Sequence, residues 1–162
     1  MRLLPILLFL VATLSVNSLS QAEETLSDSV VSKAKPLLKA FSMIGTPYKF
    51  GSNNPAKGLD CSGFVKYIYK ETADVSLPRS ARDMSREGQA VAREELEPGD
   101  LVFFNTRKRP NTHVGIYAGN GEFVHASSTR TKQVTVSRMD QKYWATRFNG
   151  ARRVLPASSP IQ

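Results

Sequence analysis

The stretch GLDCSGFVKYIYK, residues 58–70, holds the only cysteine of the 162-residue chain. After Cys61, apolar residues recur at the spacing of one helical face, at Phe64, Val65, Ile68 and Tyr69. The pattern predicts a helix from about residue 61 to residue 72. Unpaired backbone N–H groups in the first turn of a helix favour a thiolate over a thiol. Cys61 is therefore a candidate nucleophile, and the alternative is a small core hydrophobe.

The composition is that of one globular domain. A chain of 162 residues can bury one core, and its 41% hydrophobic and 22% charged residues exclude a wholly disordered protein. The net charge of +8 suits an acidic polymer, an anionic membrane or nucleic acid. Because the basic residues are scattered and no nucleic-acid motif occurs, we expect no nucleic-acid partner.

The N-terminal segment has the features of an export signal. Arg2 precedes an apolar run over residues 3–16, and Ser20-Gln21-Ala22 is a small-x-small cleavage site, which predicts a secretory signal peptide over residues 1–22. The run is shorter than the roughly 20 residues of a comfortable transmembrane helix, and no cysteine near the cut can take a lipid. We therefore expect an exported protein, periplasmic or cell-wall associated, without stable membrane insertion or a lipid anchor. In such an oxidising compartment an unpaired thiol is more often reactive than structural.

The remaining pattern predicts helices first and strands later. Residues 23–44 have helical spacing, interrupted by Pro36, with a predicted core face of Val30, Ala34, Leu37, Phe41 and Ile44. Ser80 can cap a short helix with Asp83 three residues on. Strands are predicted at residues 101–104, 113–118, 122–126, 133–137 and 151–155. This order favours an α+β fold with an antiparallel sheet, as one domain over residues 23–155 and a disordered tail over 156–162.

The Gly119-Asn120-Gly121 hairpin carries the only two histidines on its strands. A three-residue loop would set residue 118 opposite 122 and His125 opposite Gly115, with His113 two residues along on the same face. A two-residue loop would place the histidines on opposite faces. Since Gly121 suits the left-handed conformation that the longer loop needs, we expect the two imidazoles to meet.

These side chains predict nucleophilic catalysis. Cys61 would attack a carbonyl carbon, His113 would act as base and acid, and His125 would orient His113. The Cys61 backbone N–H could stabilise the oxyanion. This chemistry needs no cofactor and no metal. Two alternatives remain open: a zinc hydrolase with the same three side chains as ligands, and a non-catalytic binding module.

The chain resembles a known family in six motifs that occur in order. They are GTPYKFG, GLDCSGFV, LPRSA, PGDLVFF, HVGIYAGNGEFVHA and ARRVL, from about residue 45 to 155. They resemble the NlpC-type bacterial cell-wall cysteine peptidases, most of all the Spr-like murein endopeptidases. The resemblance implies a papain-like α+β fold in which the cysteine helix packs on an antiparallel sheet. It also implies hydrolysis of peptide bonds in peptidoglycan stem peptides, next to D-amino acids and diaminopimelate. The sequence does not determine the oligomeric state, and we favour a monomer.

The resemblance also implies roles for individual residues. It assigns the catalytic triad to Cys61, His113 and His125, a place near the oxyanion to Tyr48, and the substrate cleft to Asp60, Ser62 and Ser80. The chain departs from the family pattern at Ser52, where a second glycine is expected, and in a longer loop before Cys61. It also has Arg79 where relatives that trim short wall peptides have an acidic residue for a free amine. The resemblance therefore favours peptides within the wall mesh, or a carboxylate-bearing cross-link, over a free N-terminus.

Overall fold

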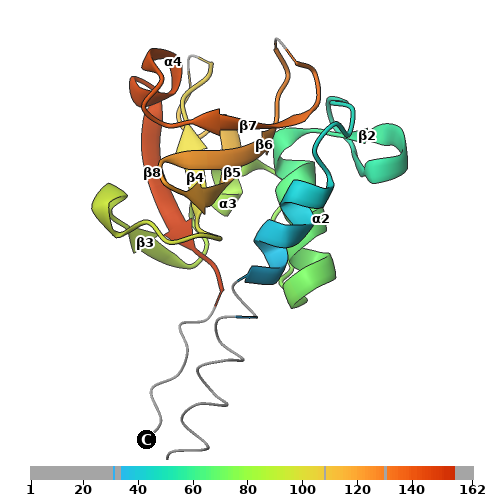
Figure 1. The fold of residues 1–162 in the computed structure, drawn as a ribbon, viewed down its shortest axis with the longest axis horizontal. Coiled ribbons are helices and arrows are strands. Elements are labelled where there is room, and N and C mark those ends of the chain that lie inside the picture. The colour runs from blue at the N-terminus through green and yellow to red at the C-terminus, as the bar shows by residue number, and fades with distance from the viewer. Residues whose placement is uncertain (1–30, 32–33, 108, 130, 156–162) are drawn as a thin grey trace, which may run out of the picture.

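A six-stranded antiparallel sheet with a helix against one face forms the domain (Figure 1). The computed structural model describes residues 31, 34–107, 109–129 and 131–155, so the predicted signal peptide and tail lie outside the described residues. The strand order is β3-β8-β4-β5-β6-β7. The strands are β3 (Gln89–Val91), β4 (Leu101–Phe104), β5 (His113–Gly119), β6 (Glu122–Ala126), β7 (Val134–Arg138) and β8 (Phe148–Arg153). The predicted α+β class is confirmed.

Short elements connect this sheet to the cysteine helix. The helices are α2 (Cys61–Ala73), α3 (Ala81–Met84) and α4 (Lys142–Ala145), with 3-10 turns η1 (Pro55–Lys57) and η2 (Arg93–Glu95). The predicted loop before Cys61 contains a small ribbon of β1 (Asn53–Asn54) and β2 (Gly58–Leu59). The prediction missed β3 and started β8 too late. Both strands contain few residues that favour strands. They form through pairing, since β8 pairs with β4 on one side and with β3 on the other.

The helix before the cleft matches the predicted core face only in part, since Leu37 packs against the core as predicted but Phe41 and Ile44 do not. Residues 34–42 are helical, and the predicted start lies outside the described residues. Phe41 is 39% exposed and Ile44 is 48% exposed, whereas Ala40 and Met43 are buried. Apolar residues occur on every side of this segment, since Leu38 is also exposed, so periodicity could not select the buried face.

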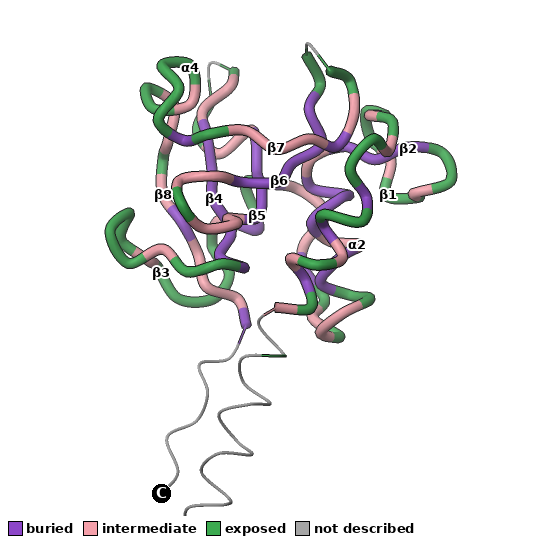
Figure 2. Tube along the Cα trace, viewed as in Figure 1, coloured by how far each residue is buried: buried purple, intermediate pink, exposed green. Residues whose placement is uncertain are grey.

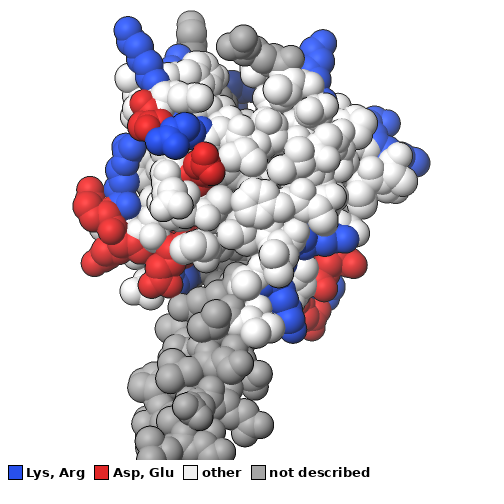
Figure 3. Space-filling view, viewed as in Figure 1, with Lys and Arg blue, Asp and Glu red and all other residues white. Residues whose placement is uncertain are grey.

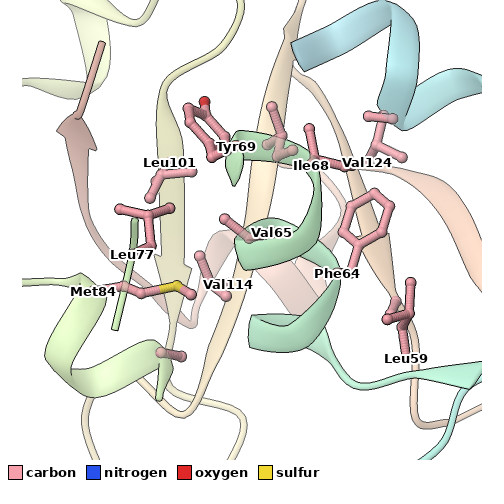
Figure 4. Packing of buried hydrophobic residues seen from close by; sticks show 14 of the residues in the cluster. Leu59, Phe64, Val65, Ile68, Tyr69, Leu77, Met84, Leu101, Val114 and Val124 are labelled. Atoms are coloured by element: carbon pink, nitrogen blue, oxygen red, sulfur yellow. The ribbon is translucent and has the colours of Figure 1, made fainter. Parts of the chain in front are cut away.

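Helix α2 begins at Cys61 as predicted. The Asp60 side chain caps it by accepting a hydrogen bond of 2.7 Å from the Gly63 N–H. The predicted apolar face is confirmed, because Phe64, Val65, Ile68 and Tyr69 are all wholly buried. These side chains pack on the sheet against Leu101, Val114 and Val124 (Figure 4), and the same layer is purple in Figure 2. Burial of each large side chain contributes roughly 1.5–3 kcal/mol and fixes the helix over β5 and β6.

Gly63 lets the preceding loop lie directly on the first turn of α2. A Cβ atom at this position would stand 2.1 Å from the Ser52 carbonyl oxygen, which is closer than any side chain permits. The same oxygen accepts a 3.0 Å hydrogen bond from the Asp60 N–H. The backbone around Ser52 and the start of α2 are therefore held together, and the position of Cys61 depends on both.

The β5–β6 hairpin reaches the predicted register by a different turn. Asn120 and Gly121 form a two-residue turn with φ of 51° and 75°, and Gly119 pairs with Glu122. The predicted pairing of 118 with 122 is wrong. A bulge between Tyr117 and Gly119 adds the extra residue, so Tyr117 still pairs with Phe123 and both histidines stay on one face. Gly119, at φ 96°, supplies the conformation that the bulge needs.

The charged surface is mixed on the face drawn in Figure 3. Basic and acidic side chains lie mostly towards its edge, with acidic ones at the left and at the lower right, and a broad central area carries neither sign. The positive net charge is therefore not concentrated on this face. In the described ranges, no helix combines the length and the apolar character that a bilayer crossing requires.

Candidate active site

A cleft of about 600 Å³ opens at the start of α2. Five of the seven predicted site residues line it, namely Tyr48, Asp60, Cys61, Ser62 and Ser80. The other two, His113 and His125, are buried in the neighbouring sheet at 6% and 1% exposure. The remaining lining residues are Phe50, Gly51, Arg79, Ala81, Arg82, Arg107, Arg109, Pro110, Asn111 and Thr112. The cleft thus joins the loop before Cys61, α3 and the loop between β4 and β5.

The two histidines meet as predicted. His113 Nε2 and His125 Nδ1 are 2.8 Å apart, with the rings nearly perpendicular at 84°. Gly115 makes this possible, because a Cβ there would stand 2.6 Å from the Phe123 ring and 3.2 Å from His125 Cβ. His125 Nε2 continues the chain to Ser137 Oγ at 2.9 Å. Three side chains on the adjacent strands β5, β6 and β7 therefore form one hydrogen-bonded row.

Sequence reasoning missed Ser137. The β6–β7 register pairs His125 with Thr135, so Ser137 lies two residues along on the same face. The only signal was the alternating strand predicted at residues 133–137, and its register relative to β6 depends on a loop without a recognisable turn motif.

Cys61 lies beside the start of strand β5. The Val114 backbone, one residue after His113, hydrogen-bonds to the thiol, and this bond lowers the Cys61 pKa. His113 uses Nε2 for His125, which leaves Nδ1 without a hydrogen bond among the described residues. Among the residues that the structure describes, no hydrogen bond joins Cys61 to His113. Such catalytic bonds are often long in the free enzyme and shorten when substrate binds.

Burial decides the charge states of these groups. It raises the pKa of the Cys61 thiol, and the negative charge of Asp60 adds to the effect, while backbone hydrogen bonds with Val114 and Ser62 oppose it. Burial also lowers the pKa of His113 to about 4 and that of His125 well below its usual value. The resting pair is therefore a neutral thiol with a neutral imidazole. The predicted stabilisation of a thiolate by the helix N-terminus is outweighed by desolvation.

Trp144 of α4 supplies much of this burial. Its ring centroid lies 5.3 Å from His113 and 5.0 Å from His125, and Phe123 stacks on His125 at 4.8 Å. An aromatic enclosure of this kind removes water from the imidazoles and limits their rotation. Nothing local in the sequence indicates that Trp144 lies over the histidines.

The buried histidines predict a loss of stability in acid. The pKa of His113 is about 4 in the fold against 6.5 when exposed, so its contribution is complete above pH 6.5 and is lost as the pH falls towards 4. His125 shifts in the same direction. We expect the free energy of unfolding to fall by about 3 kcal/mol between pH 7 and pH 4 from His113 alone, as measured by urea unfolding.

The matched control for this measurement is His113→Gln, which fills the site without a group that titrates. Its free energy of unfolding should depend less on pH than that of the wild type over the same range. Carboxylates titrate equally in both proteins, so only the difference between the two profiles reports His113. Parallel profiles would contradict the assignment.

Asp60 and Ser62 line the cleft, but their polar atoms are already bonded. Asp60 Oδ1 accepts from the Gly63 N–H, Ser62 Oγ and Arg79 Nη1, and Oδ2 accepts from the Gly51 N–H and Arg79 Nη2. The two Arg79 bonds measure 3.0 and 2.6 Å, and Arg79 Nη1 also donates to Ser62 Oγ at 2.9 Å. This network ties the loop at Gly51 and the segment at Arg79 to the start of α2.

Ser80 and Tyr48 also line the cleft. Ser80 caps α3 as predicted, accepting from the Asp83 N–H at 3.1 Å and donating to Asp83 Oδ2 at 2.6 Å. Tyr48 is half-buried, and burial together with the charges of Cys61 and Asp60 raises its pKa. Tyr48 therefore keeps its proton at neutral pH and can donate a hydrogen bond into the cleft.

The zinc alternative has no geometric support. In the described ranges, no three side chains of the His, Cys, Asp and Glu types converge on a point where they could hold a metal ion. The nitrogens that His113 and His125 turn to each other are joined by a hydrogen bond.

Known proteins match most of the chain. The NlpC/P60 family model matches residues 45–153. The chain is 44% identical over 114 residues to the murein DD-endopeptidase MepS/murein LD-carboxypeptidase of Escherichia coli K12, covering 70% of this chain and 58% of that protein. It is 38% identical over 145 residues to the gamma-DL-glutamyl hydrolase of Bacillus subtilis 168, covering 86% and 35%.

A solved structure agrees with these matches. An NlpC/P60 family protein from Bacillus cereus superimposes with a TM-score of 0.70 at 32% identity, over 76% of this chain and 40% of that one. This likeness confirms the papain-like α+β arrangement. The chain spans 58% or less of the length of each of these three proteins. Because the family model covers well over half of the sequence, the chain belongs to the NlpC/P60 family.

Proposed function

We propose that this protein is a cysteine peptidase that hydrolyses peptide bonds in the stem peptides or cross-links of peptidoglycan. The observation that carries the proposal is the placement of a single thiol in an open cleft, beside a buried His-His-Ser row. The name of the murein endopeptidase relative supports the same substrate. The thiol chemistry rests on the residues of this chain.

The row suits a general-base mechanism that starts from neutral groups. As Cys61 Sγ attacks the carbonyl carbon, His113 Nδ1 takes the thiol proton, and the imidazolium then protonates the leaving amine. The resulting thioester is hydrolysed by a water molecule that His113 deprotonates. His113 Nε2–H donates to His125 Nδ1, and His125 Nε2–H donates to Ser137 Oγ, which fixes the tautomer and spreads the developing positive charge.

The oxyanion of the tetrahedral intermediate would form at the start of α2. The Cys61 N–H lies in the first turn, where backbone donors have no partner within the helix, and the helix dipole favours negative charge there. The Tyr48 hydroxyl lines the same cleft and stays protonated. We assign both groups to oxyanion stabilisation, and Asp60, Ser62 and Ser80 to shaping the cleft.

The predicted signal peptide belongs to the same proposal. A peptidase that acts on the wall must leave the cytoplasm, and residues 1–22 supply the export signal, with cleavage after Ala22. The exported protein would be periplasmic or associated with the cell wall and act as a monomer.

Digestion of purified peptidoglycan tests the function. Incubation with the protein, followed by mass spectrometry, should release fragments cut within stems or at cross-links and thereby identify the bond. Iodoacetamide should block the release and a chelator should not. Wall binding without fragment release would support a non-catalytic module instead, and inhibition by the chelator alone would support a metal hydrolase.

A further inference from the structure

The cleft carries an excess of positive charge beside Cys61. Four arginines line it, at positions 79, 82, 107 and 109, together with one carboxylate, Asp60. We infer that Arg82, Arg107 and Arg109 form a carboxylate-binding site that makes the enzyme prefer acidic peptides with free carboxylates to the same peptides in amidated form. The inference rests on the proposed function and specifies its substrate class.

Arg79 does not belong to this site, because its charge is already neutralised. Its guanidinium binds both oxygens of Asp60 at 3.0 and 2.6 Å, and Asp60 has no oxygen left for a substrate ammonium. The sequence pointed to Arg79 as the residue that disfavours a free amine. Because the Arg79–Asp60 pair brings no net charge to the cleft, we assign the selection of a carboxylate to the other three arginines.

The three remaining guanidinium groups lack a carboxylate partner among the described residues. Asp83, the acidic residue next to Arg82 in sequence, has other partners. It accepts a hydrogen bond from Ser80 Oγ at 2.6 Å, and its Oδ1 lies 3.8 Å from Arg86 Nη1. All three arginines are exposed, so an incoming carboxylate pays little to desolvate them. Their planar forks match the two oxygens of a carboxylate, whereas an amide offers one acceptor and no charge.

The loop between β4 and β5 holds two of these arginines in place. Thr112 Oγ1 accepts from the N–H groups of Thr106 and Arg107 at 3.0 and 3.1 Å, and the Arg109 N–H donates to the Arg107 carbonyl at 2.7 Å. Asn111 is bonded to two other segments, donating to Ser85 Oγ just after α3 and accepting from the Asn149 side chain on β8, both at 2.8 Å. These bonds hold the backbone of Arg107 and Arg109 in place before substrate binds, which reduces the entropic cost of recognition.

Arg107 reaches towards the reacting end of the cleft. Its guanidinium lies 5.7 Å from the centre of the Phe50 ring, and its charge is close enough to lower the pKa of Tyr48 against the effect of burial. A carboxylate bound there would lie within one or two residues of the scissile bond. Peptidoglycan stems carry such carboxylates on γ-linked glutamate and on diaminopimelate. Poly-γ-glutamate presents the same group on every residue.

A pair of synthetic peptides tests the site. One is a stem peptide with free carboxylates, and the other is identical except that these groups are carboxamides. For the wild type we expect kcat/KM about tenfold higher for the free acid, mainly through a lower KM. In the double variant Arg107→Gln, Arg109→Gln the ratio should fall well below the wild-type value, because only Arg82 remains to bind the carboxylate. Arg93→Gln, which removes an exposed arginine outside the cleft, should keep the wild-type ratio.

The outcomes separate this inference from the proposed function. Equal cleavage of both peptides by the wild type, or an undiminished preference in the double variant, would overturn the carboxylate site. If neither peptide is cut, the proposed function fails, and calorimetric binding of the same peptides to the wild type and the double variant then decides the site alone. Cleavage of poly-γ-glutamate in place of the stem peptide, lost in the double variant, would support the site and identify that polymer as the source of the carboxylates.

Discussion

Cys61→Ala should lower stem-peptide cleavage by at least about a thousandfold without unfolding the protein. The chain has no second cysteine, so no other thiol can replace it. The fold should survive because α2 keeps its cap, Asp60, and its buried face, and because alanine is a good helix former. The measurements are kcat/KM on a defined muropeptide and the free energy of unfolding, which should change by no more than about 1 kcal/mol.

Cys61→Ser is the matched control for this loss. The hydroxyl keeps the size and polarity of the thiol, but its higher pKa makes it a poor nucleophile for a neutral imidazole to activate. The serine variant should therefore be folded and almost as inactive as the alanine variant. If either variant is well folded and still cleaves at the wild-type rate, Cys61 is not the nucleophile.

The elements that sequence predicted well depend on local patterns. Helix α2 has an apolar stripe and a cap within thirteen residues, and the β5–β6 hairpin has alternating strands around a glycine-rich turn. These two elements alone bring Cys61 near β5 and set the histidines on one face. The turn itself was predicted wrongly, but the bulge beside Gly119 restored the register, because burial of Val124 against α2 permits only one face to turn inward.

The features that sequence could not predict depend on distant contacts. Ser137 joins the histidine row only because β7 pairs beside β6, and Trp144 covers both imidazoles only because α4 folds back over the sheet. The lowered pKa values of both imidazoles follow from burial of this kind. Likewise, the pairing of Arg79 with Asp60 requires the segment before α3 to lie on the start of α2, which no spacing in the sequence indicates.

His113→Gln should reduce kcat by at least about a thousandfold, as much as the loss of the thiol. Glutamine can fill the space and hydrogen-bond to His125, but it cannot take a proton from Cys61. His125→Gln should reduce kcat less, because His113 remains as the base and loses only the group that orients it. Ser137→Ala should have a smaller effect still. The readout is kcat with its pH profile, which His125→Gln should shift and a purely structural change should leave in place.

The combination Cys61→Ala, His113→Gln decides whether the two residues act together. If the imidazole acts only by moving the proton of this thiol, then replacing His113 in a protein that already lacks the thiol should cause no further loss of rate. The double variant should therefore be no slower than either single variant. Additive losses would mean that His113 acts on the substrate independently of Cys61. That result would refute the general-base step, and equal losses would show that the missing hydrogen bond between the two groups forms during turnover.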